Sequence, residues 1–381
     1  MRGPTLWSDS GASAHPIRRL GGAAPGRLML PDASPTPGTM YAPRGVWTDG
    51  SKVVVCDTGN HRVLIWHTWP DHDGAPADVV LGQRDFTTEG PQAAGTETHR
   101  GLHLPTSACV IDGRLVVADA WNHRILGWEG IPTESFATPT YLLGQPDLDS
   151  VLPNQGGDPG LGTFYWPFNM GVVADVFWVT DTGNRRVLGW RGSTLPEPGR
   201  PADILLGQDD AAQRGDNRGE GVGAMSFRWP HAVAGDERTL YIADAGDHRV
   251  LGWTPPPLDG EREADIVLGQ QDLLAFDEFK NRPQGAQRMR FPYAIASDSR
   301  RIVVGDTSNN RILLWHTWPR EGAGVPADTV LGQPDMDANG ENRWQAVEDD
   351  SLCWPYGVCL AGDRLAIADS GNNRVMFWEL A

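Results

Sequence analysis

Long apolar runs are missing from this sequence. No segment reaches the roughly 18 consecutive apolar residues of a membrane-spanning helix, and the N-terminal stretch MRGPTLWSDSGASAHPIRRL lacks the apolar centre of a secretory signal peptide. Cysteine is also rare: the four cysteines show no CxxC spacing, which favours free thiols in a reducing compartment. We therefore expect a soluble, cytoplasmic protein without a membrane partner.

Positive charge is in short supply too. The chain has 32 Lys and Arg residues against 49 Asp and Glu residues, which gives a net charge of −17 at pH 7. This balance makes a nucleic acid an unfavourable main partner. Long helices are also disfavoured, because 46 glycines and 30 prolines interrupt the chain, and many short strands are expected instead.

One phrase recurs six times along the chain. Its copies are DTGNHRVLIW from Asp57, DAWNHRILGW from Asp119, DTGNRRVLGW from Asp181, DAGDHRVLGW from Asp244, DTSNNRILLW from Asp306 and DSGNNRVMFW from Asp369. Successive copies are 62 or 63 residues apart, and the phrase LGQ follows each of the first five. Repeats that fill the chain indicate a single repetitive domain. We place it at residues 17–381, after an N-terminal tail of residues 1–16.

Each repeat predicts four short antiparallel strands, which in the first repeat are PRGVW, KVVVCD, HRVLIW and ADVVLGQ. Six such units predict an all-β fold, a six-bladed β-propeller. The sixth repeat has no LGQ strand of its own. Each LGQ glutamine precedes the next repeat's proline by 22 residues, and the same count back from Pro43 reaches Gly21 in PIRRLGG. We expect this segment to complete the last blade and remove its open edge.

The phrase VxVxDxGNHRVxxW after a proline resembles the NHL repeat, and the resemblance covers about residues 17–381. It implies the six-bladed propeller but no single activity, because similar propellers serve as enzymes, RNA binders and protein-docking platforms. Side chains common to all blades are expected to hold the fold. The aspartate should accept backbone hydrogen bonds in the turn, the arginine should pair with an aspartate, and the last tryptophan should pack between sheets. The LGQ glutamines are interpreted in the same way.

Positions that differ between blades are the candidates for binding. The residues after the first-strand proline are Arg44, Thr106, Phe168, His231, Tyr293 and Tyr356, and those two places before it are Tyr41, His103, Tyr165, Arg228, Arg290 and Cys353. If these positions reach the axis, they form a funnel rich in Arg, His and Tyr, which suits an anionic or aromatic ligand. The predicted ligand-binding residues are Arg44, His103, Tyr165, Asn169, Arg228, Arg290 and Trp121.

Two groups of aromatic residues near the funnel receive different interpretations. Trp166, Trp229, Phe291 and Trp354 occupy one equivalent place directly before the proline and are expected in the core. Trp121 replaces a small residue of the repeat and is expected to be exposed on the funnel face. His61, His123 and His248 occupy the variable place of the repeat and are expected to be exposed turn residues.

A binding protein is the function that this pattern favours, with a small anionic molecule or a peptide in the funnel; a protein partner is a further candidate. The alternative is a metal-assisted lyase or hydrolase, with Tyr293, Tyr356 and His231 as catalytic residues. His103, His231 and Cys353 belong to alternate blades, so they are candidate ligands of a zinc-like divalent ion on the axis. The amidating lyase domain is similar to NHL propellers and uses a metal with axial histidines, which this sequence matches only in part. RNA recognition is disfavoured by the charge.

Overall fold

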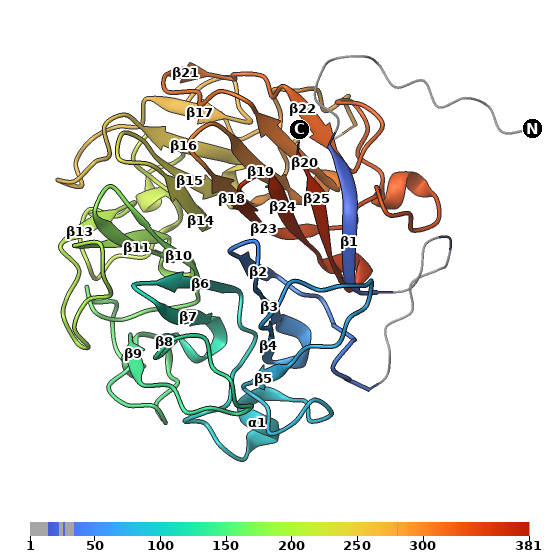
Figure 1. The fold of residues 1–381 in the computed structure, drawn as a ribbon. Coiled ribbons are helices and arrows are strands. Elements are labelled where there is room, and N and C mark those ends of the chain that lie inside the picture. Colours follow the sequence, from blue (N-terminus) through green and yellow to red (C-terminus); the bar gives the residue numbers. More distant parts are fainter. Residues whose placement is uncertain (1–13, 23–25, 27–33, 280, 381) are drawn as a thin grey trace, which may run out of the picture.

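The computed structural model describes residues 14–22, 26, 34–279 and 281–380. They form six antiparallel sheets around a central axis, which confirms the predicted six-bladed β-propeller (Figure 1). Among these residues, no helix is long and apolar enough to cross a membrane.

The blades are numbered here in chain order and each runs from its innermost to its outermost strand. Blade 1 contains β2 (Gly45–Thr48), β3 (Val53–Asp57), β4 (Arg62–Trp66) and β5 (Val79–Leu81). Blade 2 contains β6 (Ser107–Ile111), β7 (Arg114–Asp119), β8 (Arg124–Trp128) and β9 (Tyr141–Leu143), and the short α1 (Pro91–Gly95) lies in the loop that enters it. Blade 3 contains β10 (Pro167–Val173), β11 (Val176–Asp181), β12 (Arg186–Arg191) and β13 (Ile204–Leu206).

The second half of the chain repeats the pattern. Blade 4 contains β14 (Pro230–Gly235), β15 (Leu240–Asp244), β16 (Arg249–Trp253) and β17 (Ile266–Leu268), and β21 (Gly322–Ala323) extends it in parallel. Blade 5 contains β18 (Pro292–Ser297), β19 (Ile302–Asp306), β20 (Arg311–Trp315) and β22 (Thr329–Leu331). Blade 6 contains β23 (Pro355–Ala361), β24 (Arg364–Asp369), β25 (Arg374–Glu379) and β1 (His15–Gly21).

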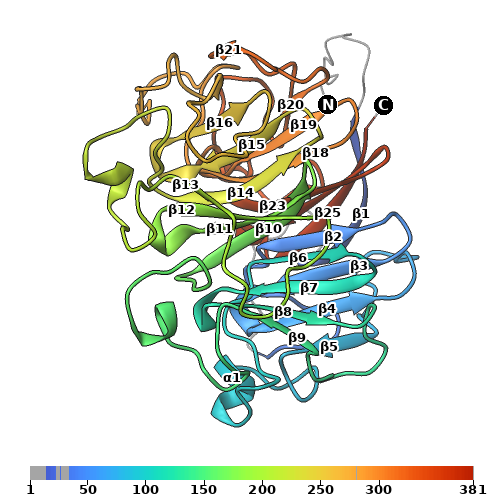
Figure 2. The same ribbon diagram turned by 90° about the vertical axis from the view of Figure 1, so that its left-hand side faces the viewer.

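The N-terminal strand closes the ring, as predicted. β1 lies beside β25 in both views (Figures 1 and 2) and pairs with it antiparallel. Leu20 lies opposite Val375 as Leu81 lies opposite Val63 in blade 1, so Gly22 rather than Gly21 takes the place of the LGQ glutamine. The strand also begins at His15, two residues before the predicted start of the domain. The strand position predicted from the 22-residue spacing was therefore wrong by one residue, because the loop into blade 1 is one residue shorter than the loops into the other blades.

The shared aspartate and arginine form a buried ion pair in every blade. The Arg Nε to Asp Oδ2 distances run from 2.7 to 3.2 Å, and both side chains are fully buried. In blade 1, Asp57 also accepts the backbone N–H of Tyr41, and Arg62 donates to the carbonyl oxygens of Phe86, Thr36 and Thr39. The pair thus joins the turn to two loops, which confirms its structural interpretation. Breaking such a buried pair costs about 3–5 kcal/mol.

The last tryptophan of the repeat packs between neighbouring blades, also as predicted. Trp66 shares an apolar cluster with Val375 and Phe377 of blade 6. Its indole Nε1 donates to the carbonyl oxygen of Ala75 at 3.0 Å, in the connection to the fourth strand. The indole ring therefore fills the seam between sheets while its one donor is satisfied.

The side chain at the variable place of the turn connects consecutive blades. Five blades carry His61, His123, His248, Asn310 and Asn373 here, and we call these residues the turn acceptors. Each accepts the backbone N–H of the residue that precedes the first-strand proline of the next blade, at 2.8 to 3.2 Å. The prediction that these histidines are exposed was wrong for His123 and His248, which are 6% and 3% exposed, and His61 is half-buried. The next blade covers the turn, which the sequence of one repeat does not reveal.

Blade 3 breaks this pattern. It carries Arg185, which has no acceptor atom, and the N–H of Trp229 in blade 4 donates instead to Asp244 at 3.0 Å. In the other five blades the residue equivalent to Trp229 has a left-handed φ of 47 to 57°. The seam between blades 3 and 4 is therefore built differently from the other five.

Candidate functional site

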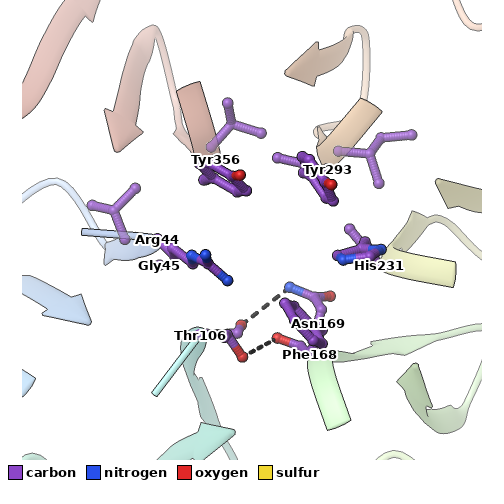
Figure 3. Close-up of a pocket in the computed structure, with 15 residues that line it drawn as sticks. Arg44, Gly45, Thr106, Phe168, Asn169, His231, Tyr293 and Tyr356 are labelled. Atoms are coloured by element: carbon purple, nitrogen blue, oxygen red, sulfur yellow. Dashed lines mark hydrogen bonds between the residues drawn. The ribbon is translucent and has the colours of Figure 1, made fainter. Parts of the chain in front are cut away.

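Six equivalent side chains meet at one end of the central axis. Arg44, Thr106, Phe168, His231, Tyr293 and Tyr356 line one cavity of about 440 Å³, together with backbone and small residues of the innermost strands. Figure 3 shows Arg44, His231, Tyr293 and Tyr356 directed into a common space. Each comes directly after the first-strand proline, so one register in β2, β6, β10, β14, β18 and β23 places all six. We call this space the axial cavity.

Arg44 is the only fully charged side chain among the described residues that line the axial cavity, and no carboxylate lines it. Its guanidinium carbon lies 4.7 Å from the centroid of the Tyr356 ring. No described Asp or Glu forms an ion pair with it. A half-buried guanidinium stacked on an aromatic face retains its donors for an anion.

His231 lines the axial cavity as a neutral ring. Its Nδ1 lies 2.9 Å from the carbonyl oxygen of Trp229. A carbonyl oxygen can only accept, so Nδ1 carries the proton and Nε2 has a free lone pair. Burial, with a smaller contribution from Arg44, lowers the pKa of His231 to about 3. At neutral pH this residue adds an acceptor to the cavity but no second positive charge.

Tyr293 and Tyr356 supply phenol groups. Their rings are stacked, with centroids 4.7 Å apart. Burial raises the pKa of both hydroxyls, so they stay protonated at neutral pH. Neither hydroxyl hydrogen-bonds to a described residue, and both are therefore available donors.

Asn169 lines the same cavity, but its amide is already engaged. Its Nδ2 donates to Ser107 Oγ at 3.1 Å, and its Oδ1 accepts the N–H of Val233 at 3.2 Å. Beside it, the hydroxyl of Thr106 donates to the carbonyl oxygen of Phe168 at 2.7 Å (Figure 3). These bonds join blades 2, 3 and 4 and fix the wall of the cavity.

A second pocket of about 470 Å³ opens beside the axial cavity, and we call it the tryptophan pocket. Its lining residues are Trp121, Trp166, Phe168, Thr182, Gly183, Arg185, Trp229, His231 and Tyr293. Phe168, His231 and Tyr293 also line the axial cavity, so the two spaces are adjacent. Trp121 lies at 5.3 Å from Trp166 and 5.7 Å from Phe168 between ring centroids.

The tryptophans before the proline were expected in the core, and this expectation was wrong. Trp166 and Trp229 are partly exposed and line the tryptophan pocket, and Trp354 is 41% exposed. They lie at the propeller face because the chain only enters the sheet at the following proline. Trp121, expected on this face, lies there half-buried among other rings.

The residues two places before the proline line neither cavity, although His103, Tyr165, Arg228 and Arg290 were predicted to bind the ligand. They are Tyr41, His103, Tyr165, Arg228, Arg290 and Cys353. They lie over the turn of their own blade: Tyr165 covers Gly183, and Arg228 covers Gly246. Arg228 and Arg290 have carboxylate neighbours, with Asp216 at 3.9 Å and Glu278 at 3.8 Å respectively.

The proposed metal ligands do not come together. His231 lines the axial cavity, whereas His103 packs against His61 at 5.2 Å between ring centroids and Cys353 is buried over its own turn. Within the described part of the chain, no group of three or more His, Cys, Asp or Glu side chains could hold a metal ion. The zinc-like ion therefore stays a prediction without a fitting ligand set.

Comparisons with known proteins add the following. No protein-family model matches the chain, and no curated protein sequence matches it. The NHL resemblance therefore stays a prediction, whereas the six-bladed propeller is confirmed by the sheet topology of the structure.

Solved structures with a similar fold include streptogramin B lyase, at 14% identity over 97% of this chain and 98% of that one, with a TM-score of 0.47. The WD40 β-propeller domain of Doa1 shows 12% identity over 91% and 97% of the chains, with a TM-score of 0.47. A structural-genomics protein from Bacteroides thetaiotaomicron shows 13% identity over 97% and 76%, with a TM-score of 0.49. Similarity at this level carries no argument about activity.

Proposed function

We propose that the protein binds a small anionic molecule in the axial cavity. The observation that carries this proposal is Arg44, a cation that pairs with no described carboxylate in a cavity whose described lining contains no acidic residue. The Arg44 guanidinium is the counter-charge of the ligand, and the hydroxyls of Tyr293 and Tyr356 donate to it. Hydrogen bonds to charged groups contribute about 1.5–3 kcal/mol each when the site is desolvated.

The shape of the site supports a small molecule, because side chains from all six blades converge on the axial cavity. A peptide would satisfy the same proposal only with its terminal carboxylate facing Arg44.

The lyase or hydrolase alternative has less support. A general base works best with a pKa near the working pH, whereas the pKa of His231 is about 3. The raised pKa values of Tyr293 and Tyr356 also make their phenolates scarce at neutral pH. Side chains with these properties suit hydrogen bonding to a bound anion better than proton transfer.

A pair of probes of equal size tests the proposal. Benzoate and benzamide differ in charge, and their binding to the full chain is measured by ligand-observed NMR titration. We expect benzoate to bind about tenfold more tightly than benzamide, because one charge-assisted contact contributes about this factor. Arg44→Gln should remove the difference.

Arg300→Gln is the matched control, because Arg300 is an exposed arginine in the β18–β19 turn at the opposite end of blade 5, where it pairs with Asp363. It should leave both affinities unchanged. Equal binding of benzoate to the wild type and to Arg44→Gln would refute the proposed anion site.

A further inference from the structure

The tryptophan pocket lies where two positions depart from the repeat. Trp121 replaces the Gly or Ser that the other five blades have at this place of the turn. Arg185 replaces the histidine or asparagine that acts as turn acceptor elsewhere. Both departures line the same pocket, one from blade 2 and the other from blade 3. Since the remaining blades show that the fold requires neither residue, their convergence points to a function of this pocket.

The walls of the tryptophan pocket are aromatic and its charges are compensated. Trp121, Trp166 and Trp229 come from three successive blades and surround it together with Phe168. The Arg185 guanidinium donates from Nε to Asp216 at 2.5 Å and also bonds the carbonyl oxygen of Gly183. No carboxylate is among the described residues that line the pocket. Aromatic faces attract cations as well as flat uncharged groups, but the Arg185 guanidinium lines the same pocket and disfavours a second cation, so the pocket suits an uncharged, flat group.

The axial cavity, which is the part of the site proposed to bind the anion, has one positive charge. His231 stays neutral because its pKa is about 3, and Arg44 is the only full charge that lines the axial cavity. One planar guanidinium matches one planar carboxylate. A phosphate monoester, with its charge of about −1.5 to −2 at pH 7, would remain partly uncompensated there.

The two halves of the site lie within reach of one ligand. His231 and Tyr293 line both spaces, and their rings are in edge-to-face contact with centroids 4.4 Å apart. We infer that the ligand is an aromatic monocarboxylate, with its carboxylate on Arg44 and its ring system among Trp121, Trp166 and Trp229. The free Nε2 of His231 accepts a hydrogen bond from a hydroxyl or N–H group between these two parts. This inference rests on the proposed function and specifies its ligand class.

Four probes test the inference on the full chain by isothermal titration calorimetry: 2-naphthoate, benzoate, 2-naphthamide and inorganic phosphate. We expect 2-naphthoate to bind about tenfold more tightly than benzoate, because its second ring reaches the tryptophans. It should also bind more tightly than 2-naphthamide and phosphate. Trp121→Ser should weaken 2-naphthoate about tenfold and leave benzoate within about twofold.

Trp121→Ser is a mild change for the fold, since Ser308 occupies the equivalent place in blade 5. Unchanged thermal unfolding of the variant checks this point. Trp344→Ser is the control for loss of an indole, because Trp344 is 77% exposed and lines neither space. It should bind all four probes like the wild type.

The outcomes separate the two proposals. If Arg44→Gln weakens both acids but 2-naphthoate binds no better than benzoate, or Trp121→Ser has no effect, the aromatic ligand class is refuted and the anion site stands. If Trp121→Ser weakens 2-naphthoate and Arg44→Gln weakens neither acid, the anion site is refuted. Tighter binding of phosphate or of 2-naphthamide than of 2-naphthoate would refute the monocarboxylate.

Discussion

At the scale of single residues, the turn acceptors show how one side chain can hold two blades together. His61 and His123 accept a backbone N–H through Nδ1, at 3.2 and 3.1 Å. Only the neutral imidazole has this lone pair. Burial, assisted by the nearby His103, lowers the pKa of both histidines to about 4, from an ordinary value of about 6.5.

The consequence is a loss of stability in acid. Between pH of about 6.5 and 4 the unfolded chain takes up protons at these histidines while the folded chain does not, so the free energy of unfolding falls as the pH falls. The double variant His61→Asn/His123→Asn should show a shallower fall, because asparagine accepts the same bond without titrating. Urea unfolding at a series of pH values measures the slope.

The chain itself supplies the precedent for that variant, since Asn310 and Asn373 accept the equivalent N–H groups at 2.9 and 2.8 Å. His231 is present in both proteins and contributes equally to both slopes. His316→Asn, a change at an exposed histidine whose ring contacts the hydroxyl of Thr329 and forms no ion pair with a described residue, should keep the wild-type slope. A double variant as acid-sensitive as the wild type would show that the turn histidines do not titrate on unfolding.

At the scale of the element, the fourth strand of each of blades 1 to 5 is followed directly by a glycine, for a steric reason. The glycines of the five LGQ phrases have φ between 85 and 97°, a conformation that side chains rarely adopt. In blade 3, a Cβ on Gly207 would lie 2.3 Å from the ring of Phe227. The glycine lets the loop into the next blade pass over its own strand, and Gln208 then donates to the carbonyl oxygens of Arg185 and Gly215.

Gly207→Ala should therefore destabilise the protein by about 2–4 kcal/mol, as the sum of left-handed backbone strain and overpacking. Gly162→Ala in the preceding entry loop is the control: a Cβ there meets no atom within 4 Å, and the effect should stay within about 0.5 kcal/mol. Chemical unfolding of both variants measures the difference. Equal stabilities would contradict the steric role of the LGQ glycine.

At the scale of the whole molecule, β1 makes the ring continuous. It pairs with β25 from His15 to Gly21, and Leu20 is buried in the cluster between blades 6 and 1. The first and last parts of the described chain thus share one sheet, so unfolding of this blade opens the propeller. An open ring exposes the edge of β25, which favours association between molecules.

Deletion of residues 1–21 should lower the melting temperature and produce oligomers, as measured by thermal denaturation and analytical ultracentrifugation. Leu20→Ala should cost about 2–5 kcal/mol without removing the strand. Arg18→Gln, at a side chain that is 26% exposed and pairs with Asp73, is the control and should change stability by at most about 1 kcal/mol. A monomeric deletion variant with unchanged melting would refute ring closure by β1.

The six-fold repetition of the whole molecule also explains where the candidate site lies. The six-fold pattern requires the buried Asp–Arg pairs and the seam tryptophans in every blade, so these residues are unavailable for recognition. The residues after the proline have only to face the axis, and five different residue types therefore occupy this place in the six blades. Arg44 belongs to this freer set, and Trp121 shows that the third place of the turn can vary as well.

The sequence by itself determined the fold, because a six-fold repeat reveals its period, its strands and its closing segment without any contact being known. It also placed Arg44, His231, Tyr293 and Tyr356 among the candidates for the axis, together with the residues two places before the proline, which line neither cavity. The sequence also marks Arg185 as exceptional, because arginine lacks the acceptor atom that histidine or asparagine provides at this place in the other five blades.

Only the tertiary structure decided which side chains face the axis and which face a neighbouring blade. Tyr165 and Arg228 cover their own turns, and His123 and His248 are buried under the next blade. Such contacts depend on how adjacent blades pack against each other. The periodicity of the sequence fixes the spacing of residues along the chain, but the distance between blades and the direction of each side chain follow from packing.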